Sequence, residues 1–187
     1  MRKLKLQVQT SIDGYMAGPN GEMDWMTFPW TEDIGTYINA LTEPVDTIVL
    51  GRKLAEGFIP AWEAGPPGEP QEAIDRMNRT PKVVITDSLT ESPWKNATVA
   101  GGDLSKTINE LKERDGGDII VYGGSTLVTG LIACGLVDEL HLFVNPSAIG
   151  DGLPVFANLD DNQRFQVVDV RPFDCGITAM VYAPKGD

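Results

Sequence analysis

The sequence predicts one α/β domain over residues 1–187, with a central sheet that is parallel in the middle and ends in an antiparallel pair of C-terminal strands. Three apolar runs rich in β-branched residues lack alternation: DTIVL (46–50), KVVIT (82–86) and DIIVY (118–122). Such runs are typical of central parallel strands that helices cover on both faces. Helical patterns separate the runs, and 187 residues are enough to bury one good core.

The outer strands carry a different pattern. Lys3–Thr10 (KLKLQVQT) alternates strictly between apolar and polar residues, which predicts a strand with one wet face at a partly exposed or edge position. A long loop rich in Gly, Pro and Asn follows from Asp13 to about Trp30, and Asp33–Leu41 is predicted to be a helix. The other predicted helices are Gly51–Phe58, Glu69–Arg79, Asp103–Lys112 and Ser125–Ile132, and the other strands are Ala97–Ala100, Glu139–Val144, Phe165–Val170 and Ile177–Tyr182.

The charge balance excludes several functions. The chain has 15 Lys and Arg against 27 Asp and Glu, a formal net charge of −12. A duplex nucleic-acid binder needs a basic face to release counterions from the phosphates, and anionic membranes also attract basic surfaces. No run of about 20 apolar residues exists for a transmembrane helix. We therefore expect a cytoplasmic protein that binds neither nucleic acid nor membrane.

Metal-binding patterns are missing as well. Cys134 and Cys175 are far apart in the sequence, and His141 is the single histidine. No zinc spacing can be built from them, so we expect a reduced cysteine pair and no metal.

Two junctions of strand, glycine and helix carry the strongest chemical signal. In VDTIVLGRKL a buried strand reaches Gly51 before a helix that starts with Arg52 and Lys53. In DIIVYGGSTLVTGL a second strand reaches Gly123 and Gly124 before a helix. Glycine lets backbone approach a ligand, a helix N-terminus attracts anions, and both junctions lie at the carboxyl ends of strands. The alternative is that these glycines only form tight turns.

Neither junction matches a common nucleotide fingerprint. No GK[ST] follows, and the spacing of Gly123, Gly124 and Gly130 does not fit GxGxxG. Five segments, in order, resemble the dihydrofolate reductase-like superfamily, and most closely the reductase domain of the bacterial riboflavin biosynthesis deaminase-reductase and its stand-alone relatives. They are SIDGYMAGPNGEMDW (11–25), VLGRKL (49–54), VVITDS (83–88), VYGGSTL (121–127) and HLFVNPSAIGDGLPVF (141–156).

The resemblance implies a three-layer α/β/α fold with a mixed, mostly parallel sheet of about eight strands, bound NADPH and a homodimer. It implies that Gly51 and Arg52, with Lys53 beside them, meet the 2′-phosphate and the pyrophosphate. It also implies that the pyrophosphate lies on the second junction, across an unusual Gly–Gly peptide bond. The residues implied there are Gly123, Gly124, Ser125, Thr126 and Leu127.

The remaining implied contacts lie on loops. Thr86, Asp87 and Ser88 would line the adenine-ribose side, and the loop from Asp13 to Trp25 would close over the nicotinamide. The residues implied near the nicotinamide are Met16, Ala17 and Gly21, and Asn145 falls at the polar position on the substrate side.

Three departures from the pattern bear on function. Leu54 replaces a phosphate-binding Thr, and Asp87 would repel a 2′-phosphate, so a preference for NADPH over NADH rests mostly on Arg52. The folate-binding carboxylate has no clean match. Asp33 is the first candidate for the proton donor, and the alternative is an ordinary acid of the first helical turn.

The functional prediction is therefore an NADPH-dependent oxidoreductase that passes hydride to a pyrimidine- or pterin-like heterocycle. It would resemble the 5-amino-6-(5-phosphoribosylamino)uracil reductase of riboflavin biosynthesis. The alternatives are dihydrofolate reduction proper and a module that binds NADPH without chemistry. The sequence does not identify the substrate.

Overall fold

The computed structural model describes residues 1–157, 159 and 161–185. Its helices are α1 (Glu32–Thr42), α2 (Arg52–Ala64), α3 (Gln71–Arg79), α4 (Leu104–Glu113) and α5 (Ser125–Ala133). Its strands are β1 (Leu4–Thr10), β2 (Tyr15–Ala17), β3 (Val45–Gly51), β4 (Lys82–Ile85), β5 (Ala97–Ala100), β6 (Asp118–Val121), β7 (Glu139–Val144), β8 (Leu153–Pro154), β9 (Phe165–Pro172) and β10 (Thr178–Pro184).

Eight of the strands form one sheet in the order β5-β4-β3-β6-β1-β7-β10-β9. The six strands from β5 to β7 are parallel, and β10 runs antiparallel to both β7 and β9. The predicted fold class is confirmed: a three-layer α/β structure with a mostly parallel sheet and antiparallel C-terminal strands. Strands β2 and β8 pair separately as a small antiparallel sheet.

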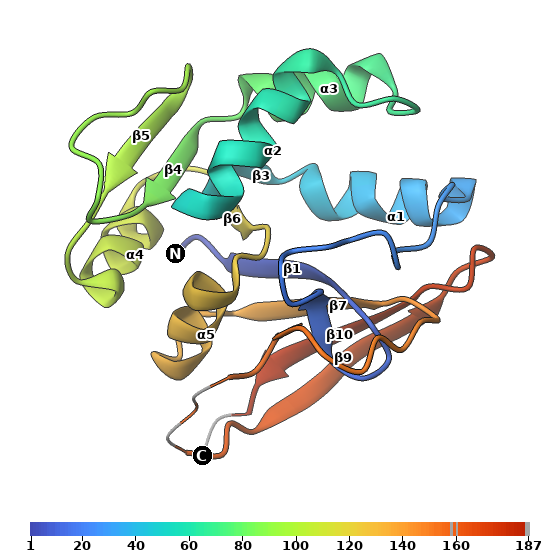
Figure 1. The fold of residues 1–187 in the computed structure, drawn as a ribbon. Coiled ribbons are helices and arrows are strands. Elements are labelled where there is room, and N and C mark those ends of the chain that lie inside the picture. Colours follow the sequence, from blue (N-terminus) through green and yellow to red (C-terminus); the bar gives the residue numbers. More distant parts are fainter. Residues whose placement is uncertain (158, 160, 186–187) are drawn as a thin grey trace.

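Helices α1, α2 and α3 cover one face of the sheet, and α4 and α5 cover the other (Figure 1). On β3, Ile48 and Leu50 pack with Ala55 and Ile59 of α2, whereas Val49 packs with the α4 and α5 side. Both faces of these strands are therefore apolar, which is why their sequences show no alternation. Among the described residues, no helix is long and apolar enough to span a bilayer.

The prediction for the N-terminal strand is wrong. Strand β1 lies between β6 and β7 in the centre of the sheet, and all its residues are buried except the half-buried Gln9. Its polar residues Lys5 and Gln7 are each 7% exposed. Alternation predicts an edge because polar residues normally face water. Here the polar side of β1 is turned under a helix layer. The prediction of an edge position for a C-terminal strand is confirmed, since β9 is an edge strand of the sheet.

Three other boundaries differ from the prediction. The loop predicted from Asp13 contains strand β2, and Leu153–Pro154 forms strand β8, because two or three residues of pairing give too short a pattern to detect. Helix α2 continues through Pro60 to Ala64 instead of ending at Phe58. The extra turn carries Trp62, whose ring packs 6.0 Å from that of Phe58.

Candidate active site

The fold brings the two glycine junctions together. Strands β3 and β6 are neighbours, with Val49 opposite Val121, so both chains leave the sheet at the same edge. A Cβ atom on Gly124 would lie 3.9 Å from the backbone nitrogen of Gly51, and one on Gly51 would lie 3.6 Å from Cβ of Leu127. The glycines therefore keep side chains out of one shared space at the carboxyl edge of the sheet.

Both helices that start at this edge leave their first amides without a side-chain cap. The N-cap residues are Gly51 for α2 and Gly124 for α5, and neither cap is closed by a side chain. The first turns of a helix hold four N–H groups without intrahelical partners and about half a positive charge. Two such termini side by side present backbone amides of the kind that bind anions.

The second junction needs glycine for its backbone conformation. Gly123 and Gly124 have φ angles of 68° and 89°, in the left-handed region that other residues rarely adopt. The peptide bond between them is trans, so the unusual feature of this dipeptide lies in its φ angles. Ser125 and Thr126 follow as the first residues of α5, with Leu127 buried behind them.

Arg52 supplies a cation to this surface. Its guanidinium forms an ion pair with Glu56, one helical turn later on α2, and its side chain is 34% exposed. Lys53 is exposed beside it. The i,i+4 spacing could have revealed Glu56 in the sequence as the partner that competes with an anionic ligand.

The loop after β4 folds back on the loop after β5. The amide of Gly102 donates to the carboxylate of Asp87 at 2.6 Å, and the hydroxyls of Thr86 and Ser88 are 2.9 Å apart. A Cβ atom on Gly101 would lie 2.8 Å from the carbonyl oxygen of Thr86, so glycine permits this close packing. Asp87 thus already has a partner for its carboxylate.

The segment from Asp13 to Gly21 makes strand pairing, core packing and side-chain contacts with the rest of the protein. Met16 and Ala17 are 7% and 8% exposed on β2, and the Met16 side chain packs into the main hydrophobic core. Gly21, with a φ of 91°, forms an exposed turn after them. The Asp13 carboxylate accepts hydrogen bonds from the amides of Ile149 and Gly150. The pKa of Asp13 is lowered most by its hydrogen bond with the Ser11 side chain and further by these two amides.

Asn145 organises the part of this edge that follows β7. It is fully buried just after β7, and its Nδ2 donates to Oε1 of Gln9 at 2.9 Å and to the carbonyl oxygen of Phe143 at 3.1 Å. Its Oδ1 accepts from the amide of Thr27 at 2.9 Å. Asn145 therefore connects β1, β7 and the chain that leads into α1.

Asp33 has a structural set of partners. Its carboxylate accepts bonds from the hydroxyl of Thr31 at 2.5 Å, from the amide of Ile34 at 2.9 Å and from the amide of Asp174 in the turn between β9 and β10 at 3.0 Å. The Thr31 hydroxyl is the largest cause that lowers the pKa of Asp33, which favours the ionised form and disfavours proton donation. These contacts match an acid of the first helical turn.

The predicted residues thus fall into two groups at one edge. Both junctions and the Thr86 loop follow the neighbouring strands β6, β3 and β4, whereas Asn145 and Asp33 lie beyond β1. Sequence reasoning missed Gln9, the partner of Asn145, because it was assigned to the wet face of an edge strand. Only the pairing register of β1 with β7 identifies Gln9 as this partner.

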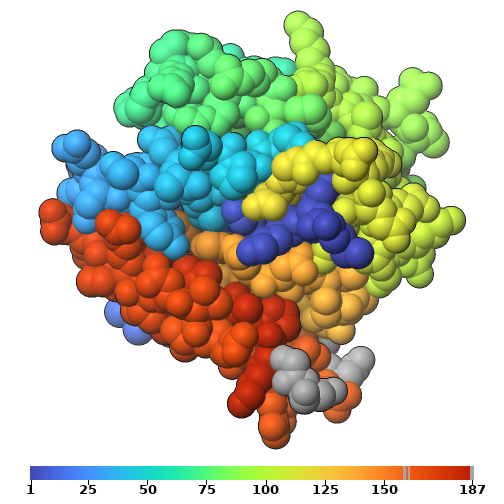
Figure 2. Space-filling view, turned by 180° about the vertical axis from the view of Figure 1, so that it is seen from behind, coloured from blue at the N-terminus to red at the C-terminus, as the bar shows by residue number. Residues whose placement is uncertain are grey.

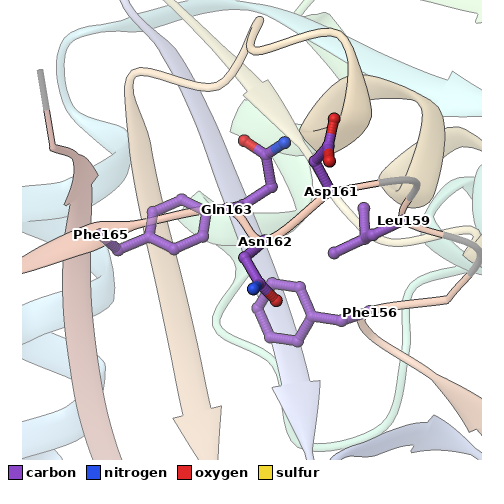
Figure 3. A pocket seen from close by; sticks show the side chains of 6 residues that line it. All are labelled: Phe156, Leu159, Asp161, Asn162, Gln163 and Phe165. Carbon is purple, nitrogen blue, oxygen red and sulfur yellow. The ribbon is translucent and has the colours of Figure 1, made fainter. Parts of the chain in front are cut away.

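A hollow of about 480 Å³ lies beside the start of β9 (Figure 3). Its lining contains none of the predicted site residues and consists of Phe156, Leu159, Asp161, Asn162, Gln163 and Phe165. Residues 158 and 160, which interrupt this stretch, lie outside the described part of the chain. Within the described residues no cluster of three His, Cys, Asp or Glu side chains could hold a metal ion.

Comparison with known proteins gives a consistent result. A family model described as the RibD C-terminal domain matches residues 2–179. The uncharacterized protein YyaP of Bacillus subtilis is 31% identical over 189 residues, covering 99% of this chain and 96% of its own. A solved putative riboflavin biosynthesis protein from Shewanella sp. PV-4 superposes with a TM-score of 0.78 at 24% identity, covering 98% and 99% of the two chains.

The fold also extends to dihydrofolate reductase. The Enterococcus faecalis enzyme, solved in complex with NADP(H), superposes with a TM-score of 0.65 at 17% identity, covering 98% of this chain and 97% of that one. At this identity the likeness concerns the fold, and it confirms the dihydrofolate reductase-like architecture.

Proposed function

Because the chain belongs to the family of the RibD C-terminal domain, we propose that it is a cytoplasmic NADPH-dependent reductase that passes hydride to a pyrimidine- or pterin-like heterocycle. One observation carries the proposal: two uncapped helix N-termini and three glycines meet at the carboxyl edge of β3 and β6. This surface suits a pyrophosphate, because the backbone amides at Gly123 and Gly124 can bind it without a cationic side chain.

The roles of the residues follow from their positions. Gly123 and Gly124, with the first amides of α5, bind the pyrophosphate, while Arg52 pairs with the extra phosphate of NADPH. Ser125 and Thr126 add hydroxyl donors. Bound nicotinamide supplies the hydride, so the protein has to position the two reactants and exclude water.

The substrate side has a positioning role. Asn145 fixes the chain around Thr27 against β7, and thereby the entry into α1. Hydrogen bonds from Thr31 and Asp174 lower the pKa of Asp33 further below neutrality, so we assign it to anchoring the turn at Asp174 and take the proton from water. This assignment replaces its predicted role as proton donor.

The decisive measurement is a titration with NADPH and NADH, followed by tryptophan fluorescence. Arg52→Ala should weaken NADPH binding by about 1–3 kcal/mol, roughly 5- to 150-fold in Kd, and leave NADH nearly unchanged. Glu56→Gln is the matched counterpart: it frees Arg52 and should strengthen NADPH binding about twofold. Equal losses for both cofactors in Arg52→Ala would contradict the contact with the 2′-phosphate.

The dihydrofolate reductase-like fold supports a second candidate function, the reduction of dihydrofolate. Turnover of dihydrofolate by the wild-type protein would support this function. No turnover would eliminate it as a candidate. Binding of NADPH without oxidation by any pterin or ribosylaminopyrimidine would instead identify a non-catalytic module.

We also propose that a second copy of this chain pairs with the edge strand β9. Val167, Val168 and Val170 are 59%, 57% and 50% exposed there, and β9 lies uncovered along the outer margin of the molecule (Figure 2). Antiparallel pairing of β9 with itself about Val170 would bring Asp169 of one copy opposite Arg171 of the other. This self-complementarity favours a homodimer over an unrelated partner.

Sedimentation equilibrium tests this pairing. We expect a dimer at micromolar concentration and a monomer for Val170→Lys, because two lysines would face each other at the two-fold axis. A wild-type monomer would contradict the proposal, and an unchanged dimer in the variant would shift the interface elsewhere.

A further inference from the structure

The loop that follows β4 begins beside the start of α2. Strands β3 and β4 are parallel neighbours, and Gly51, the last residue of β3, is opposite Ile85, the last residue of β4. The chain therefore leaves the two strands at the same level of the sheet, into Arg52 after β3 and into Thr86 after β4. The first residues of this loop thus adjoin the edge at which Arg52 begins its helix.

Asp87, the second residue of this loop, is held in place by hydrogen bonds. The amide of Gly102, just after β5, donates to its Oδ1 at 2.6 Å. The amide of Thr86 donates to the carbonyl oxygen of Ala100 at 2.9 Å, and the amide of Ser88 donates to the Thr86 hydroxyl at 3.1 Å. The backbone on both sides of Asp87 is therefore positioned by the protein itself.

One oxygen of the Asp87 carboxylate is open to a ligand. Asp87 is exposed, and its Oδ2 accepts no hydrogen bond from any group in the described part of the chain. A carboxylate accepts hydrogen bonds and has no proton to donate. A positioned carboxylate with one open oxygen therefore suits a hydroxyl group and repels a phosphate.

The cations beside this loop are balanced by acids. Arg52 forms an ion pair with Glu56 one turn later on α2, and the two side chains are 34% and 51% exposed. Lys53 is exposed next to Arg52. These two cations are matched by two carboxylates, those of Glu56 and Asp87. A phosphate at this place would therefore meet no net positive charge, whereas a neutral hydroxyl is indifferent to the balance.

We propose that Asp87 accepts a hydrogen bond from the adenosine 2′-hydroxyl of NADH, so that the protein binds NADH about as tightly as NADPH. The inference rests on the proposed function and concerns which of the two reduced dinucleotides its site admits. In Rossmann sheets an acid binds the ribose 2′-hydroxyl of NAD, and an arginine accommodates the 2′-phosphate of NADP. Here Arg52 and Asp87 act in opposite directions, because the guanidinium favours the phosphate and the carboxylate favours the hydroxyl.

Titrations of the full chain with NADH and with NADPH, followed by tryptophan fluorescence, test this inference. The wild type should bind the two dinucleotides with Kd values within about tenfold of each other. Asp87→Asn removes the charge and keeps an oxygen that accepts from the amide of Gly102. It should bind NADPH about threefold more tightly and NADH about threefold more weakly, because a repulsion and a charge-assisted hydrogen bond are both lost.

Asp103→Asn is the matched control. Asp103 is exposed one residue after Gly102, and its carboxylate accepts from the amide of Lys106 at 2.7 Å as the N-cap of α4. The substitution removes the same charge and keeps the cap, because Asn caps a helix about as well as Asp. The ratio of the two Kd values should stay within about twofold of wild type, since an exposed charge that does not contact the ligand is screened.

The outcomes separate the two proposals. An unchanged ratio of Kd values in Asp87→Asn, or a wild-type Kd for NADH more than about tenfold above that for NADPH, would overturn the role of Asp87. Binding of neither dinucleotide by the folded wild type would overturn the proposed function, and this inference with it. If Asp87→Asn does not fold, Asp87→Ser removes the same charge and should shift the ratio in the same direction.

Discussion

The carboxyl ends of β3 and β6 and those of β1 and β7 form two halves of one edge, built in different ways. The first half is made of backbone: Gly51, Gly123 and Gly124 and two uncapped helix starts. The second is made of side chains, above all Gln9 on β1 and Asn145 just after β7. Backbone sites depend on the absence of Cβ atoms, so single added methyl groups should disable the first half. The second half should respond to changes of polarity at constant size.

The largest effect is expected from Gly124→Ala. A Cβ atom there enters the space shared with Gly51, and a φ of 89° adds about 1–2 kcal/mol of backbone strain. We expect NADPH binding to weaken by at least about 2 kcal/mol, roughly thirtyfold in Kd, in a fluorescence titration.

Gly135→Ala is the matched control for this variant. Gly135 follows the other end of α5 with a φ of 64°, and a Cβ atom there would meet nothing within 4 Å. It should lose similar stability in a urea melt and keep its affinity for NADPH. Equal affinity losses in both variants would mean that strain, and not the shared space, explains the result.

Asn145→Asp tests the half that is made of side chains. The substitution keeps the shape but turns a carboxylate oxygen toward the acceptors on Gln9 and Phe143. We expect a loss of about 3 kcal/mol in the free energy of unfolding, measured by urea denaturation, because a buried charge would face oxygen atoms. NADPH binding by the folded fraction should persist. Wild-type stability would show that the bonds from Nδ2 to Gln9 and Phe143 do not contribute to the stability of the fold.

The two halves also differ in how far the sequence predicts them. The runs DTIVL and DIIVY, each followed by glycine, are local signals, so their pattern alone is enough to locate the central strands and both junctions. The central position of β1 in the sheet could not be predicted in this way. Its alternation is the same for a wet edge strand and for a central strand with buried amides, and only the pairing with β6 and β7 distinguishes them.

Long-range partners account for the remaining difference. Asp33 looks like a candidate acid until the amide of Asp174, 141 positions later, is seen to donate to its carboxylate. Strands β2 and β8 stabilise each other across more than a hundred residues of sequence. Such contacts have no local pattern, so the sequence locates the β3–β6 half of the edge better than the β1–β7 half.

Asp33→Asn has the smallest expected effect and separates the two roles of that residue. Hydrogen bonds lower the pKa of Asp33 in the folded protein, so its ionised form contributes stability above its ordinary pKa of 3.8, and this contribution is lost as the pH falls through the folded value. In urea melts between about pH 7 and about pH 3, the variant should be slightly less stable near neutrality, and the difference should vanish in acid. Hydride transfer at neutral pH should stay within about twofold of wild type, because an ionised carboxylate donates no proton. A large loss of turnover with unchanged stability would restore Asp33 as the proton donor and would make the β1–β7 half of the edge catalytic as well as structural.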